Sequence, residues 1–130
     1  MPRPRTDVPD AELAVLKVLW DRGRATIREI TDRLYPEGGT SHYATVQKLL
    51  ERLRDRAYVE RRREGRAHVF SARVAREDLI RHRLRDAAEK LCEGSLTPLL
   101  TQLVSDGRLA EDEIRALRAL VDELDPGGAS

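Results

Sequence analysis

Residues 40–70 read TSHYATVQKLLERLRDRAYVERRREGRAHVF, and this stretch decides how the rest of the chain is interpreted. Its first half carries apolar residues at i, i+3, i+4, i+7 and i+11, the repeat of an amphipathic helix. These positions are Val46, Leu49, Leu50, Leu53 and Ala57. Thr40 or Ser41 is placed to cap the start of this helix. At about 100° per residue, the face opposite the apolar positions is polar and basic.

A hairpin is predicted directly after this helix. The segments Tyr58–Arg61 and Ala67–Phe70 have the composition of two short strands, joined through Arg63–Arg66. Gly65 supplies the positive φ that a tight hairpin turn requires. The connection is rich in arginine, so we expect the hairpin to be strongly basic.

Two further helices are predicted upstream. The first is apolar on most sides, with Leu13, Leu16 and Trp20 on one face, so we expect it to be buried. Thr26 and Glu29 have the spacing of a capping box and open the second helix. Three helices followed by a basic hairpin is the order of a winged helix-turn-helix domain. We assign this domain to residues 1–76.

Residues 77–130 contain three more helical stretches that are rich in leucine and poor in aromatic residues. Packed alone, such short helices would leave apolar stripes in water, which favours pairing with a second copy of the chain. The alternative is that they fold back on the first domain. The residues expected to pair are Leu84, Leu91, Leu96, Leu99, Leu100, Leu103, Ile114, Leu117, Leu120 and Val121. The fold class predicted is therefore mainly α, a winged helix-turn-helix followed by a small helical dimerisation domain.

The formal net charge of +1 conceals an uneven distribution along the chain. Residues 40–76 hold ten bases and four acids, a balance of +6, whereas residues 77–130 hold seven bases and twelve acids, a balance of −5. This pattern is typical of one segment that binds a polyanion and one with another role. Charge alone fits a solvated surface equally well.

The outer face of the predicted third helix has the chemistry of a DNA-reading surface. Its short polar groups suit base edges, and its cations suit phosphates. The helical candidates are Ser41, His42, Tyr43, Ala44, Thr45, Gln47, Lys48 and Arg52, and those of the hairpin are Arg62, Arg63 and Arg66. For His42 and Tyr43, contact with DNA and packing on the domain are equally compatible with the sequence.

The composition argues against several other classes of protein. The 130 residues are 40% apolar and 36% charged, with no apolar run long enough to cross a bilayer and no signal peptide at the N-terminus. His42, His68 and His82 lack metal-ligand spacing, and Cys92 cannot form an intrachain disulfide. No motif of catalysis or phosphate binding is present. We therefore expect a soluble cytoplasmic protein that is not an enzyme and has no metal or cofactor.

Four segments together resemble the penicillinase-repressor family of bacterial transcription regulators, the BlaI/MecI group. The first helix, residues 11–20, resembles that of the family, including its tryptophan, and residues 45–53 are similar to its recognition helix. Glu64-Gly65-Arg66 resembles its wing tip, and residues 109–114 are similar to the entry to its last helix. The resemblance extends from about Asp10 to Leu124.

This resemblance implies a homodimer that binds dyad operators and represses resistance or stress genes. In relatives, a membrane-bound sensor-protease system triggers cleavage within the dimerisation domain, and the Asn-Phe bond cut there corresponds to Gln102-Leu103. The glycine usual after the recognition helix is Ala57 here, which implies a slightly different turn into the first wing strand. Copper-responsive relatives carry paired cysteines, and Cys92 alone cannot build that site.

A winged-helix protein-interaction module that never binds nucleic acid is the alternative function. Such a module would more often carry apolar anchors on the outer face of the third helix, where this chain has Ser41, Thr45, Lys48 and Arg52. The polar face favours DNA binding.

Overall fold

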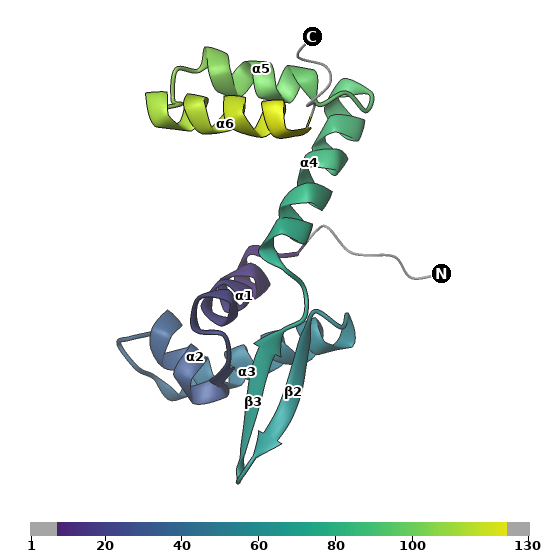
Figure 1. Cartoon of the computed structure of the whole chain (residues 1–130). Coiled ribbons are helices and arrows are strands. Elements are labelled where there is room, and N and C mark those ends of the chain that lie inside the picture. The colour runs from purple at the N-terminus through teal and green to yellow at the C-terminus, as the bar shows by residue number, and fades with distance from the viewer. Residues whose placement is uncertain (1–7, 125–130) are drawn as a thin grey trace. The chain divides into compact units, whose positions relative to one another are not determined.

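A computed structural model describes residues 8–124 of the chain (Figure 1). Contacts within it divide the chain into two compact units, residues 1–83 and residues 84–130. The division falls inside a helix, later than the boundary at Arg76 that the sequence indicates. The expectation of no signal peptide concerns residues 1–7, which lie outside the described residues.

The first unit begins with helices α1 (Asp10–Arg22), α2 (Ile27–Leu34) and α3 (Thr40–Asp55), with the two-residue strand β1 (Ala25–Thr26) between α1 and α2. The capping box at the start of α2 is confirmed. The Glu29 N–H donates to Thr26 Oγ1 at 3.2 Å, and the Thr26 N–H donates to Glu29 Oε1 at 2.9 Å. The expected cap of α3 is wrong, because Gly39 holds the N-cap position and Thr40 and Ser41 already belong to the helix.

A three-stranded antiparallel sheet completes the winged helix, with strand order β1-β3-β2. The predicted hairpin is confirmed, but β2 (Val59–Glu64) and β3 (Ala67–Ala72) are both longer than predicted, and Gly65-Arg66 alone forms the turn. Gly65 has a φ of 64°, as the turn requires. The extra length of β2 was not predicted because its backbone pairing continues through Arg62 and Arg63, where the sequence has no apolar alternation.

One apolar core holds these elements together. It takes one face from each of α1, α2 and α3, and it closes over the inner face of the sheet. Its most deeply buried members include Val15, Leu16, Leu19, Ile30, Val46, Leu50, Leu53, Val59 and Phe70. The mainly helical winged-helix fold predicted from the sequence is therefore confirmed.

The end of α3 places an alanine in a backbone conformation that favours glycine. Ala57 has a φ of 64°. The Ala57 N–H donates to Arg54 O at 2.8 Å, and the Tyr58 N–H donates to Leu53 O at 2.9 Å, which is the hydrogen-bond pattern of a Schellman motif. Ala57 thus adopts the left-handed conformation that glycine favours in this motif, and its side chain makes that conformation sterically unfavourable.

We expect Ala57→Gly to stabilise the protein by about 1 kcal/mol, because glycine removes the left-handed strain and its larger unfolded-state entropy offsets only part of that gain. Urea unfolding of the full chain at fixed protein concentration measures the difference. Ala67→Gly, in strand β3, is the control and should destabilise. Equal or lower stability of Ala57→Gly would show that the turn carries no strain.

Helix α4 (Arg76–Cys92) starts in the first unit and is tied to α1 there. The Trp20 Nε1–H donates to Val74 O at 2.8 Å, and the Arg76 guanidinium lies 5.3 Å from the Trp20 ring centroid. Leu79 is part of the core, and Arg83 Nη2 donates to Val8 O at 2.8 Å. These contacts explain why the first unit extends to Arg83.

The second unit contains the end of α4, α5 (Thr97–Ser105) and α6 (Glu111–Leu124). Of its residues whose side chains the structure describes, 84–123, Ala88 alone is buried. The unit therefore has almost no core of its own. In the part of the chain that the structure covers, no helix is long and apolar enough to span a bilayer.

Candidate nucleic-acid interface

Helix α3 is held by one face and presents the other to solvent. Val46, Leu49, Leu50 and Leu53 are between 0% and 6% exposed. The candidate residues on the other positions of the helix are all exposed, namely Ser41, Ala44, Thr45, Gln47, Lys48 and Arg52. The core thus fixes the helix while its polar and basic side chains remain available to a ligand.

The two aromatic candidates at the start of α3 have different environments. The His42 ring stacks on Tyr35, with centroids 3.9 Å apart and planes within 1° of parallel. A Cβ on Gly39 would lie 3.0 Å from His42 Cδ2, so glycine also leaves room for this ring. Tyr43 is 41% exposed and, with Arg28, lines a shallow hollow between α2 and the start of α3. His42 therefore packs on the domain, whereas Tyr43 is accessible.

The β2–β3 hairpin carries its arginines on both faces. Arg61 pairs with Phe70 and Arg63 with His68, so these two arginines share the face of the buried Phe70. Arg62 pairs with Val69 on the opposite, outer face. Arg66 lies in the turn, and all four arginines are exposed.

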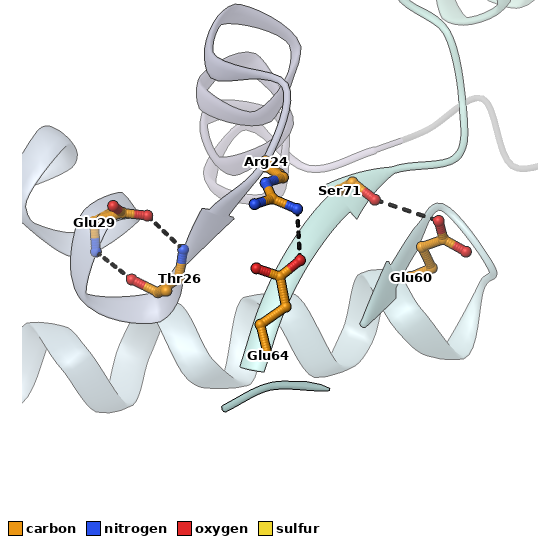
Figure 2. Close-up of polar contacts among 6 residues, drawn as sticks. All are labelled: Arg24, Thr26, Glu29, Glu60, Glu64 and Ser71. Carbon is orange, nitrogen blue, oxygen red and sulfur yellow. Dashed lines mark hydrogen bonds and ion pairs between the residues drawn. The ribbon is translucent and has the colours of Figure 1, made fainter. Parts of the chain in front are cut away.

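Two polar contacts on the outer face of the sheet were not predicted (Figure 2). Arg24, just before β1, places Nη1 2.5 Å from Glu64 Oε2 at the end of β2. On the same face, the Ser71 hydroxyl donates to Glu60 at 3.4 Å. Arg24 and Glu64 are 40 positions apart, and only the order of the strands brings them together.

A buried ion pair joins α1 to the end of α3. Glu12 is 1% exposed, and its Oε1 lies 3.4 Å from Arg56 Nη1. Within the described residues neither atom has a hydrogen-bond partner. This pair was not predicted from the sequence, although the spacing of Glu12 from Leu16 and Leu19 places its side chain on the buried face of α1.

At the start of α2, beside the sheet, the Glu29 carboxylate has both a hydrogen-bond donor and a cationic partner. The backbone N–H of Thr26 donates to the Glu29 carboxylate and lowers the pKa of Glu29, which is the largest effect. Burial opposes this shift, and Arg22, 3.3 Å away, lowers the pKa further. Arg24 also lowers this pKa. Glu29 is therefore ionised at neutral pH and fixes the helix start.

The residues expected to form a dimer lie on the second unit with their side chains largely in water. Leu99 is half-buried, and the exposed fractions of the others range from 37% for Ile114 to 77% for Leu91. The bond between Gln102 and Leu103 lies within α5, where Gln102 O accepts the Asp106 N–H at 2.9 Å. Within the described residues, no three His, Cys, Asp or Glu side chains form a metal-binding group.

A winged helix with an exposed polar third helix and an arginine-rich hairpin defines a DNA-binding transcription regulator. Residues 8–123 match the penicillinase repressor family. The chain therefore belongs to this family, the BlaI/MecI group of transcriptional repressors, as the sequence resemblance indicates.

Individual relatives agree with this assignment. The chain is 25% identical to the penicillinase repressor of Bacillus licheniformis, over 89% of this chain and 90% of that protein. It is 32% identical to the transcriptional regulator BlaI of Mycobacterium tuberculosis, over 94% of this chain and 88% of that protein. The solution structure of the DNA-binding domain of the repressor BlaI matches with a TM-score of 0.50 and 27% identity, over 59% of this chain and 93% of that domain.

Proposed function

We propose that this protein represses transcription as a homodimer that binds a dyad operator in duplex DNA through α3 and the β2–β3 hairpin. The observation that carries the proposal is the outer face of α3, which is exposed and carries polar and cationic side chains at Ser41, Thr45, Lys48 and Arg52. The adjoining hairpin adds four exposed arginines. The protein then acts by occupying DNA, with no catalytic step.

The interface contains residues suited to base edges and residues suited to phosphates. Thr45 and Gln47 carry groups that can hydrogen-bond to base edges, and Lys48 and Arg52 lie one turn apart where they can reach bases or phosphates. The hairpin arginines Arg62, Arg63 and Arg66 suit phosphates, whose neutralisation releases counterions and makes binding salt-dependent. His42 contributes by holding the start of α3 against Tyr35.

A protein-docking role for this domain is less well supported. Docking surfaces are built around exposed apolar or aromatic anchors. Between residues 8 and 75, Tyr43, at 41%, is the single large apolar side chain of the described part that is exposed rather than buried or partly buried. One tyrosine beside a row of cations favours nucleic acid.

Lys48→Ala and Arg52→Ala should each weaken binding to the upstream DNA by about 1 to 3 kcal/mol, because each removes a cation from the face that meets the duplex. Fluorescence anisotropy with a labelled duplex from upstream of the protein's own coding sequence measures the loss. Lys17→Ala, which removes an exposed cation from α1, is the matched control. If Lys17→Ala weakens binding as much as the two α3 variants, α3 is not the recognition helix.

Dimerisation is proposed for the second unit because it cannot be stable alone. With Ala88 as its one buried side chain among residues 84–123, the unit buries too little apolar surface to offset the entropy of ordering three helical segments. Its exposed leucines would cover one another in a second copy. A net charge of −5 in residues 77–130 disfavours contact with DNA and leaves the unit free for this role.

We further propose that repression is relieved by proteolysis at Gln102-Leu103, through a membrane sensor-protease system, and that resistance or stress genes are controlled. A cut there would separate α6 from the rest of the unit and remove the leucines of α6 from the dimer. The bond lies within a hydrogen-bonded helix, so α5 must open locally before a protease can bind it.

Immunoblotting of the host during exposure to a cell-wall antibiotic should show the full-length chain disappearing as the repressed genes are switched on. The control is the untreated culture. Proline at Gln102 or Leu103 is not used, because it would break α5. Derepression while the full-length chain persists would exclude cleavage as the signal.

A further inference from the structure

The ion pair between Arg24 and Glu64 connects two distant parts of the wing. Arg24 precedes β1, and Glu64 is the last residue of β2, next to the turn at Gly65-Arg66. Strand β3 lies between β1 and β2, so the pair spans the outer face of the sheet from one edge strand to the other (Figure 2). It thereby ties the tip of the wing to the body of the domain.

Glu64 introduces a negative charge into an otherwise basic segment. Residues 61–66 contain four arginines and one acid, and that acid lies beside the turn. An unpaired carboxylate there would repel phosphates and weaken binding to any DNA. Pairing with Arg24 cancels the charge of Glu64, and it also withholds the Arg24 guanidinium from phosphates.

The two partners are well exposed, 63% for the Arg24 side chain and 42% for that of Glu64. A surface ion pair of this kind contributes little to folding stability. Its consequence is expected in the geometry of the wing and in the number of cations that reach DNA.

We propose that the Arg24–Glu64 ion pair is a positioning contact that raises discrimination between operator and other DNA. The inference rests on the proposed function. Specific binding needs the wing held in one place beside α3, whereas non-specific binding needs only positive charge near phosphates. The Arg24–Glu64 pair holds the wing in place, and it limits the positive charge that is available to phosphates.

The test measures the affinities of the full chain for two duplexes, the upstream duplex and a scrambled duplex of the same composition. Glu64→Gln removes the acid and leaves Arg24 facing only a neutral amide, so binding to the scrambled duplex should tighten and its salt slope should steepen by about one unit. The ratio of the affinity for the upstream duplex to that for the scrambled duplex should fall by about tenfold. The reason is that a less ordered wing does not tighten binding to the upstream duplex. Thermal unfolding should be unchanged.

Two further variants separate positioning from charge. Glu60→Gln removes an acid from the same face and strand, so it should tighten both duplexes alike and leave the ratio unchanged. The exchanged pair, Arg24→Glu with Glu64→Arg, keeps the net charge and rebuilds the contact, so it should restore the wild-type ratio. Arg24→Gln leaves Glu64 unpaired and should weaken both duplexes.

An unchanged affinity ratio in Glu64→Gln, or an exchanged pair that fails to restore it, would overturn the positioning role while leaving the specificity of the unmodified protein intact. Equal binding of both duplexes by the unmodified protein would instead overturn the proposed function, and this inference with it.

Discussion

Replacing Leu103 on α5 and Leu117 on α6 with glutamate should convert the protein to a monomer and weaken binding to the upstream duplex by about 10²- to 10⁴-fold. The two side chains are 53% and 42% exposed in the single chain. In the proposed dimer they are covered, and a carboxylate there would be buried without a partner. Loss of the dimer makes binding of the second half-site intermolecular, which removes the gain from effective concentration.

The matched control adds the same two charges to other faces of the same helices. Thr101 on α5 and Ala119 on α6 are exposed and lie away from the leucines at about 100° per residue. Thr101→Glu with Ala119→Glu should therefore leave a dimer by sedimentation velocity. A dimer that survives in the leucine variant would assign the interface to another surface.

Arg56→Met should destabilise the protein by about 3 kcal/mol, because it leaves the buried Glu12 carboxylate without its cation. The value is taken at the low end for a broken buried pair, since the Arg56 side chain is itself 30% exposed. Methionine keeps most of the aliphatic bulk of arginine, so the lost charge dominates. Urea unfolding of the full chain at fixed concentration measures the change.

Two comparisons identify the cause of that loss. Arg54→Met removes an exposed arginine from the last turn of α3 and should change stability by less than about 0.5 kcal/mol. Glu12→Leu in the Arg56→Met background removes the stranded carboxylate and should recover most of the stability. If the double variant is as unstable as Arg56→Met, the contribution of Arg56 is packing rather than charge.

The periodicity of the sequence predicted the elements that a core requires. Val46, Leu49, Leu50 and Leu53 repeat at helical spacing because one face of α3 is buried, and the opposite face is exposed for the same reason. The capping box at Thr26 and Glu29 and the turn at Gly65 were predictable because each depends on residues close in sequence.

Contacts between distant segments could not be predicted in this way. Arg24 meets Glu64 because β3 lies between their strands, and Glu12 meets Arg56 because α1 packs across the end of α3. The stack of His42 on Tyr35 similarly depends on the backbone path through Gly39. The first unit extends to Arg83 because Leu79 joins the core, and the change in charge balance after Arg76 does not reveal this packing.

The central claim is that the exposed face of α3 and the adjoining wing recognise a specific duplex. The most direct measurement compares the affinity of the unmodified protein for the DNA upstream of its own coding sequence with that for a scrambled duplex, at low and at physiological salt. We expect about 10³-fold or greater preference for the upstream duplex and affinities that fall steeply with salt. Equal affinities for the two duplexes, or no binding at low salt, would contradict it.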